Sequence, residues 1–297
     1  MTEPIAYASP EDAAKTDKKK KNRKRKRGSK PSEPNTTGTE DSEPQIPNQT
    51  DKEDKGEGDW EQDKDDIDKI HRLRPQVTLD YCIVASSQRI ALLYSFMGKN
   101  QYTKGIVFFC SCDSVKFHSD LLRSLNANCF GVHEKQTQQE RTTTFFDFCK
   151  AEKGFLLCTN VAACGLDIPA VDWILQFDPP DDLMEYLRRV VRRARGECEV
   201  GRELLFLIPE EMRIIRFLEA ANIFLRSRVF KVNRKVQAQL EQTVGDNYYL
   251  RKSAKEAYKS YLIAYNSHSM KDYFNFDRLD LQGVAASFCV SIPPRQT

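Results

Sequence analysis

Four short runs of apolar residues recur in the central part of the chain. They cover residues 106–110 (IVFFC), 155–158 (FLLC), 173–177 (WILQF, interrupted by one glutamine) and 204–208 (LLFLI). Strands with one face in water alternate apolar and polar residues, whereas continuous apolar runs are typical of strands buried on both faces of a parallel sheet. We therefore predict four strands in the interior of a parallel sheet.

Amphipathic stretches lie between these runs and predict helices. Residues 90–96 and 115–125 carry apolar side chains at spacings of three and four, and residues 141–148 do so through Phe145, Phe146 and Phe148. Such spacings place apolar side chains on one side of a helix. The alternation of strand and helix predicts a doubly wound α/β domain, with helices on both faces of a parallel sheet, over about residues 75–220.

A small, mostly helical extension is predicted after this domain, over residues 221–297. Two helices are expected, at about residues 232–244 and 253–266. In the second helix, Tyr258, Tyr261 and Tyr265 fall on one face. These rings either stack on RNA bases or pack against the neighbouring domain. We favour packing, because an apolar stripe at helical spacing usually faces a core.

Residues 1–74 are rich in Lys, Glu, Asp, Ser, Pro and Gly and poor in branched apolar residues. Such a segment cannot bury enough surface to offset its ordering entropy, so it is predicted to be a disordered, charged tail. The whole chain has a net charge of only +3, but residues 18–27 read KKKKNRKRKR. This block is interpreted as a nuclear or nucleolar import signal, or as a nonspecific nucleic-acid arm. The alternative is a solvated tail without a specific partner.

The cysteine pattern limits the metal sites and the redox compartment that can be expected. There are nine cysteines and no CxxC pair, so neither a zinc ribbon nor another metal site is predicted. Cys110 and Cys112 lie beside an apolar run, where buried free thiols are the ordinary explanation, and a reducing intracellular compartment is expected. No stretch is apolar for long enough to span a membrane, and the N-terminus has no apolar core of a secretory signal.

Two candidate ligand-binding residues lie in the segment that follows a predicted strand. Thr159 follows the run at 155–158, at the carboxyl end where α/β sheets bind ligands. Its hydroxyl and the nearby backbone N–H groups suit a phosphate. Asp167 lies in a Gly-Leu-Asp turn, where its carboxylate either accepts hydrogen bonds from ribose hydroxyls or caps the turn.

A dense cluster of five arginines follows, at Arg188, Arg189, Arg192, Arg193 and Arg195. Guanidinium groups at such short spacing repel one another, so we predict that they face a polyanion, either nucleotide phosphates or an RNA backbone. The alternative is an exposed basic helix stabilised by the acidic neighbours Glu185, Glu197 and Glu199.

In combination, these segments resemble the DEAD-box RNA helicases. Residues 107–112 (VFFCSC) are similar to motif IV of that family, and residues 133–141 to its HGxxxQxxR element. Residues 159–169 resemble motif V, and residues 188–195 resemble motif VI, HRxGRxxR. The C-terminal tail is similar to the extension of a nucleolar ribosome-biogenesis subgroup that includes the Myc-regulated DEAD-box protein. The resemblance implies that residues 75–220 form the second RecA-like domain of such a helicase.

The resemblance also implies nucleotide-binding roles. Asp167, with Gly165 beside it, would contact ATP, and Arg192 and Arg195 match the arginine fingers that stabilise charge on the transferred phosphoryl group. In the family, ATP is held mainly by a first RecA-like domain with a P-loop and a DEAD sequence, and neither occurs among these 297 residues. ATP with Mg is therefore expected only if a first RecA-like domain is supplied, and independent catalysis is not expected.

RNA is the second ligand that the resemblance implies. Ser111, Gln138, Arg141 and Thr159 match positions that contact RNA phosphates or shape their groove. Contacts to phosphates do not read sequence, so the expected binding is independent of base sequence. The subgroup suggests ribosomal RNA precursors and pre-ribosomal proteins as partners, and a nuclear, nucleolar location.

Several matched positions depart from the family pattern. Cys164 replaces the motif V arginine, Arg188 the motif VI histidine, Val191 its glycine, and Glu134 the glycine after His133; Arg193 replaces a small residue. Two functions therefore remain open. The chain is either the C-terminal half of an ATP-dependent RNA helicase that remodels RNA in ribosome biogenesis, or a non-catalytic RNA-binding or ribosome-assembly module.

Overall fold

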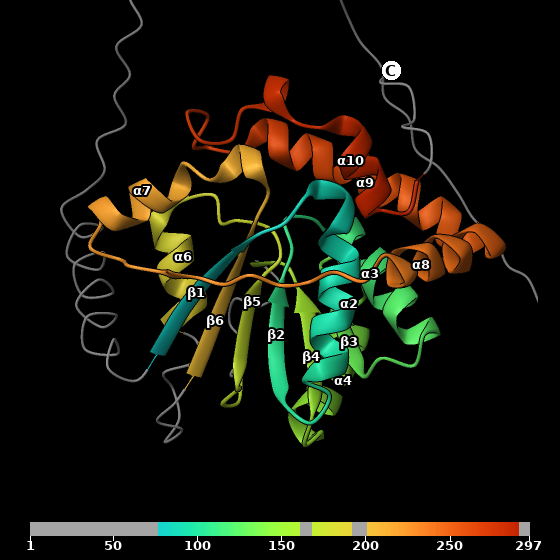
Figure 1. Ribbon diagram of the computed structural model, residues 1–297. Helices are drawn as coiled ribbons and strands as arrows, with labels where there is room; N and C mark the ends of the chain where they lie inside the picture. Colours follow the sequence, from blue (N-terminus) through green and yellow to red (C-terminus); the bar gives the residue numbers. More distant parts are fainter. Residues whose placement is uncertain (1–76, 161–167, 192–200, 291–297) are drawn as a thin grey trace, which may run out of the picture. The chain divides into compact units, whose positions relative to one another are not determined.

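A seven-stranded, all-parallel sheet forms the centre of the described structure (Figure 1). The computed structural model describes residues 77–160, 168–191 and 201–290. The strand order is β3-β4-β2-β5-β6-β1-β7. The strands are β1 (Val77–Ile83), β2 (Lys104–Phe108), β3 (Cys129–Val132), β4 (Gly154–Cys158), β5 (Trp173–Gln176), β6 (Gly201–Leu207) and β7 (Arg226–Ser227).

Helices connect the strands and then make up most of the extension. In the domain they are α2 (Arg89–Lys99), α3 (Cys112–Ser124), α4 (Gln138–Lys150), α6 (Leu183–Val191) and α7 (Ile214–Ala220). In the extension they are α8 (Arg234–Asp246), α9 (Tyr248–Ser267) and α10 (Leu281–Ser287). The α/β fold, the four interior strands and the mostly helical extension are thus confirmed. No helix within the described ranges is long and apolar enough to cross a membrane.

The side chains of β2 show why the predicted runs are apolar throughout. Val107 packs in a cluster with residues of α2 and α3, such as Leu93. Its neighbours Ile106 and Phe108 pack in a different cluster, with Phe148 of α4. Successive side chains of a strand point to opposite faces. Both faces of the sheet are therefore covered by helices, and both need apolar residues.

The two helices nearest the candidate site begin at residues suited to capping. Ser111 precedes α3, and its hydroxyl oxygen accepts a hydrogen bond from the Ser114 N–H. Thr137 precedes α4 and forms a capping box with Glu140. Side chains of this kind satisfy backbone N–H groups that have no partner in the first turn of a helix. Helix α3 begins at Cys112, shortly after β2, whereas a loop separates the end of β3 from the start of α4 at Gln138.

The extension packs on the helices of the domain rather than standing apart from them. Helix α9 packs along α3, and α8 packs against α2 and α9. Tyr258, Tyr261 and Tyr265 are buried, and the rings of Tyr258 and Tyr261 lie 6.3 and 5.7 Å from that of Phe288. The packing interpretation of the tyrosine stripe is confirmed, so these rings are not available to stack on bases.

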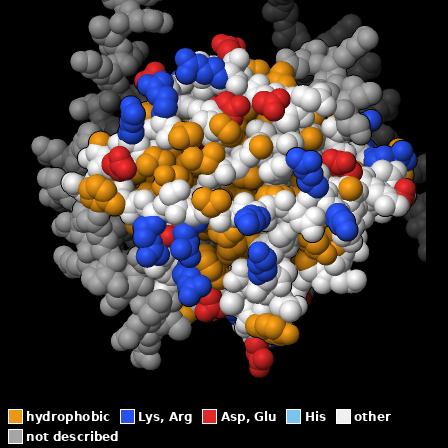
Figure 2. All heavy atoms as spheres, in the orientation of Figure 1, with side chains coloured by type: hydrophobic (Ala, Val, Ile, Leu, Met, Phe, Trp, Pro, Cys, Tyr) orange, Lys and Arg blue, Asp and Glu red, His pale blue; other side chains and the backbone are white. Residues whose placement is uncertain are grey.

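Basic side chains are dispersed on the face of the molecule seen in Figure 1. Figure 2 shows Lys and Arg side chains spread around an apolar area on this face. The chain between α7 and α8 crosses the same face (Figure 1), and Phe230 in it packs edge-on against Phe96 of α2. Basic side chains on this face therefore form no single patch.

Candidate functional site

A cleft of about 480 Å³ lies where the carboxyl ends of β2, β4 and β5 meet α9. Figure 1 shows the strands of the sheet pointing toward that helix. Ser111 and Thr159 contribute to the lining from the strand side, and Ser260, Ile263 and Ser267 contribute from α9. The carboxyl edge of an open parallel sheet is the usual place for a ligand. The extension therefore supplies one wall of this cleft.

Ser111 and Thr159 are brought together because β2 and β4 are neighbours in the sheet. The Thr159 side chain is buried, and its hydroxyl donates a hydrogen bond of 2.6 Å to Oε1 of Glu134. The Cys112 thiol donates to Oε2 of the same carboxylate. Burial, with the hydrogen bond to Glu134, raises the pKa of that thiol, so it stays protonated. Glu134 thus joins the ends of two strands and the start of α3.

Gln138 and Arg141 lie on α4 and do not line this cleft. Gln138 is exposed, and its Nε2 is 3.5 Å from the Thr142 hydroxyl. Arg141 is half-buried, and its Nε has no hydrogen-bond partner among the described residues. Both predicted RNA contacts are therefore outside the lining of this cleft, and their RNA-binding role stays a prediction.

Arg189 departs from the predicted five-arginine cluster. Its side chain is buried rather than turned toward a polyanion. The guanidinium donates to Asn160 Oδ1 at 2.7 Å, Gln176 Oε1 at 3.0 Å, the Asp178 carbonyl at 2.8 Å and Glu185 Oε1 at 2.5 Å. It joins the end of β4 to β5 and α6. The interpretation of all five arginines as one anion-facing group is therefore wrong for Arg189, and the acidic neighbour Glu185 is its partner.

Arg188, the next residue on α6, is exposed. It is the one member of the cluster that the structure describes on the surface. Arg192, Arg193 and Arg195 lie outside the described residues, as do Cys164, Gly165 and Asp167, and the side chain of Val191. The nucleotide-binding roles of Gly165, Asp167, Arg192 and Arg195 accordingly stay predictions.

A second buried arginine was not found from the sequence. Arg89, the first residue of α2, donates to the Phe177 carbonyl and, at 2.6 Å, to Asp178 Oδ1. The other oxygen of Asp178 accepts from the Cys110 N–H at 3.0 Å. The guanidinium carbon also lies 4.3 Å from the centre of the Phe177 ring. This network joins the ends of β2 and β5. It therefore also fixes the position of Ser111, which follows Cys110 in the chain.

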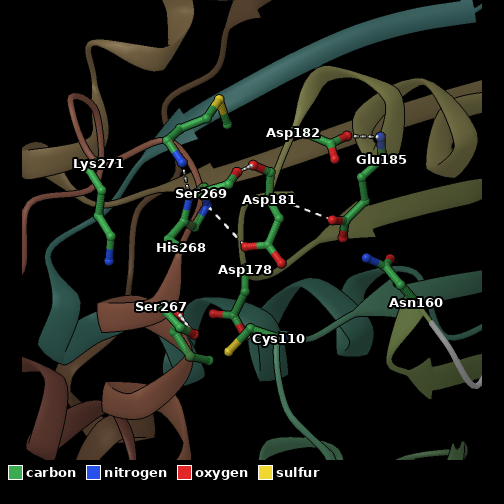
Figure 3. A network of polar contacts seen from close by, with 12 residues as sticks. Cys110, Asn160, Asp178, Asp181, Asp182, Glu185, Ser267, His268, Ser269 and Lys271 are labelled. Atoms are coloured by element: carbon green, nitrogen blue, oxygen red, sulfur yellow. Dashed lines mark hydrogen bonds and ion pairs between the residues drawn. The ribbon is translucent and has the colours of Figure 1, made fainter. Parts of the chain in front are cut away.

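Polar contacts also tie the extension to the start of α6 (Figure 3). The Ser269 hydroxyl donates to the Asp181 carbonyl, and His268 Nε2 lies 3.6 Å from Asp181 Oδ1. The Asp181 N–H in turn donates to Glu185 Oε2 at 2.9 Å. Burial lowers the pKa of His268 to about 4, so the ring is neutral at pH 7. The wall formed by α9 is therefore anchored to the same helix that carries Arg188.

Among the residues that the structure describes, no group of three or more His, Cys, Asp or Glu side chains is arranged to hold a metal ion. The described cysteines, including Cys110 and Cys112, are free thiols. Both of these are half-buried. The polar groups of the described site thus include hydroxyl, thiol, carboxylate, amide, ammonium, imidazole and guanidinium groups.

Comparison with known proteins identifies both parts of the fold. Residues 88–197 match the helicase conserved C-terminal domain, and residues 247–296 match the ATP-dependent rRNA helicase SPB4-like C-terminal extension. The chain is 56% identical over 217 residues to DEAD-box ATP-dependent RNA helicase 27 of Oryza sativa subsp. japonica. That alignment covers 72% of this chain and 37% of the relative. Over these residues the chain matches the C-terminal part of DEAD-box RNA helicases.

Its other relatives in this family include ATP-dependent RNA helicase HAS1 of Saccharomyces cerevisiae. The identity is 49% over 217 residues, which cover 72% of this chain and 43% of that protein. The chain thus spans about two fifths of the length of these curated relatives, and what it matches is their C-terminal helicase domain and extension.

Solved DEAD-box structures share the fold. Domain 2 of the helicase Mss116p, solved bound to an RNA duplex, superposes with a TM-score of 0.61 at 24% identity, over 72% of this chain and 85% of that one. Mss116 bound to single-stranded RNA and UDP-BeF gives a TM-score of 0.62 at 24% identity, over 72% of this chain and 44% of that one. At this identity the likeness establishes the fold, which is the RecA-like fold expected from the motifs.

Proposed function

We propose that this chain is the C-terminal half of an ATP-dependent RNA helicase and binds the RNA backbone at the carboxyl edge of its sheet. The observation that carries the proposal is the shared placement of Ser111 and Thr159 in one cleft of a DEAD-box C-terminal domain. Both side chains end in hydroxyls, which suit phosphate oxygens. Arg141 on α4, outside the lining of the cleft, would add a cation, and its Nε has no hydrogen-bond partner in the described part of the chain. The helicase assignment is favoured over a non-catalytic assembly module because its relatives are named ATP-dependent RNA helicases.

We further propose that ATP, with Mg, is bound only when a first RecA-like domain closes on this one. In that complex Gly165 and Asp167 would contact the nucleotide, and Arg192 and Arg195 would face the transferred phosphoryl group. Such guanidiniums act by stabilising negative charge that develops in the transition state. The support is the match of residues 88–197 to the helicase C-terminal domain and a relative of the same fold solved with UDP-BeF.

Ribosomal RNA precursors are the proposed RNA targets, with pre-ribosomal proteins as partners and the nucleolus as the location. The extension matches a family described as ATP-dependent rRNA helicase SPB4-like, and this match supports the proposal. The basic block at residues 18–27 suits a nucleolar import signal or an additional RNA contact.

Fluorescence anisotropy with a labelled single-stranded RNA tests the backbone-binding proposal. We expect weak binding whose dissociation constant rises steeply between 50 and 200 mM salt, because phosphate contacts release counterions. Thr159→Val should raise the dissociation constant roughly three- to tenfold, which corresponds to the ~1 kcal/mol that one hydrogen bond typically contributes. Thr143→Val removes an exposed hydroxyl of α4 and serves as the matched control, with a change below about twofold. Salt-independent binding, or equal affinity of Thr159→Val and wild type, would contradict the proposal.

A further inference from the structure

The Glu134 carboxylate occupies the place in the cleft where a phosphate would be bound. Oε1 accepts from the Thr159 hydroxyl at 2.6 Å, and Oε2 accepts from the thiol of Cys112, the first residue of α3. The start of a helix favours negative charge, because its backbone N–H groups and its dipole point toward the ligand. An anion is therefore already present between the carboxyl end of β4 and the N-terminus of α3, and it belongs to the protein itself.

The hydrogen bond to Glu134 occupies the Thr159 hydroxyl, which the proposed phosphate contact also requires. A hydroxyl carries a single proton, and that of Thr159 is directed to Glu134. The Thr159 side chain is buried, so it cannot turn to a second acceptor without breaking this bond. An RNA phosphate at the same place would have to displace the carboxylate or accept repulsion between two negative groups.

The surroundings hold Glu134 in this position. Its neighbour Lys135 forms an ion pair of 2.6 Å with Asp113 in the first turn of α3, so both ends of the 134–135 segment are attached to that helix. Gln136 accepts from the His133 N–H at 3.0 Å and donates to the Gly131 carbonyl at 3.0 Å. The strand-to-helix loop that carries Glu134 is thus fixed on both sides.

We infer that Glu134 is an internal competitor for the RNA phosphate and sets how tightly this domain grips RNA. The inference rests on the proposed function, since it assumes that the cleft binds a phosphate backbone. RNA binding would then include a step in which the carboxylate leaves the Thr159 hydroxyl and turns into solvent. The residue weakens binding at this cleft without affecting contacts made elsewhere in the chain.

Substitution of Glu134 in the full chain tests the inference by the same anisotropy assay. Glu134→Gly should lower the dissociation constant for single-stranded RNA about tenfold, or ~1.4 kcal/mol. Glu134→Gln keeps the size of the side chain and should tighten binding by a smaller factor, because its amide oxygen still accepts from Thr159. Glu219→Gln removes the same charge from an exposed position on α7 and should change the affinity less than twofold. Thermal unfolding of each variant verifies that it is folded.

A double variant separates competition for the hydroxyl from simple charge repulsion. In a Thr159→Val background, Glu134→Gly should tighten binding less than about threefold, because the contested hydroxyl is gone. An equal gain in both backgrounds would overturn the inference. The inference would also be overturned if Glu134→Gly left the affinity unchanged while Thr159→Val still weakened binding. In that case the proposed function would stand. Absence of RNA binding in every variant, Glu134→Gly included, would refute both.

Discussion

Replacing Arg189 with methionine removes the centre of a buried polar network, and the neighbouring Arg188 provides its natural control. Both arginines lie on α6, but Arg189 is buried and Arg188 is exposed. Methionine has a similar length and no charge, so Arg189→Met removes hydrogen bonds with little change in packing volume. The same substitution at Arg188 removes a charge that solvent already surrounds.

The magnitude follows from the contacts that are lost. Arg189 donates four hydrogen bonds, to Asn160, Gln176, the Asp178 carbonyl and Glu185. Its removal leaves the buried Glu185 carboxylate without its cation. Removing one partner of a buried ion pair costs about 3–5 kcal/mol, whereas an exposed substitution changes stability by about 0.5 kcal/mol or less. For a folded region of this size, that cost lowers the melting temperature by roughly 10 °C.

Urea unfolding followed by circular dichroism measures both effects. Arg189→Met should lower the free energy of unfolding by about 3–5 kcal/mol with the slope in urea unchanged, since the same surface is exposed on unfolding. Arg188→Met should stay close to wild type. Equal stabilities of the two variants would show that the network of Arg189 does not support the fold as described.

Two further predictions concern a buried carboxyl group and the tyrosine stripe. Burial raises the pKa of Glu203 to about 8, so the unfolded chain releases this proton near pH 4.5 while the folded chain retains it. The free energy of unfolding should therefore fall as pH rises from 6.5 to 8. The decrease should be smaller in Glu203→Gln, which has no proton to release. If the urea midpoints of wild type and Glu203→Gln depended equally on pH, the prediction would be wrong. Tyr261→Ala should cost about 3–5 kcal/mol, because the ring is buried, whereas Tyr249→Ala, at an exposed position, should cost less than about 0.5 kcal/mol. Equal melting temperatures of these two variants would refute the packing of α9.

The interior strands could be predicted because their environment is uniform. Residues 106–108 and 155–158 are buried on both faces, so a continuous apolar run is what such strands require. Strands at or near the sheet edges carry less of this signal. β3 has only four residues, β7 has two, and β1 contains the buried Asp80, which pairs with Arg226 at 3.0 Å. The charge in β1 is explained by a partner 146 positions away, which spacing along the chain does not show.

The candidate site also contains some residues that the sequence predicts and others whose roles depend on distant partners. Thr159 was predicted from its position after a strand and Ser111 from the resemblance to motif IV, and the neighbouring places of β2 and β4 in the sheet bring them together. The roles of Arg89, Arg189 and Glu134 depend on partners distant in sequence. A pattern of charges cannot separate a buried, fully bonded arginine such as Arg189 from an exposed one such as Arg188, because both occupy adjacent positions in one basic run.

The most direct test of the account is to locate bound RNA on the chain. Single-stranded RNA that contains 4-thiouridine is crosslinked to the full chain by light, and the crosslinked peptides are identified by mass spectrometry. We predict crosslinks in the segments that contain Ser111, Glu134 and Thr159, stronger in Glu134→Gly and weakened by Thr159→Val. Crosslinks confined to the basic block at residues 18–27, with no change in either variant, would contradict the claim that the carboxyl edge of the sheet binds the RNA backbone.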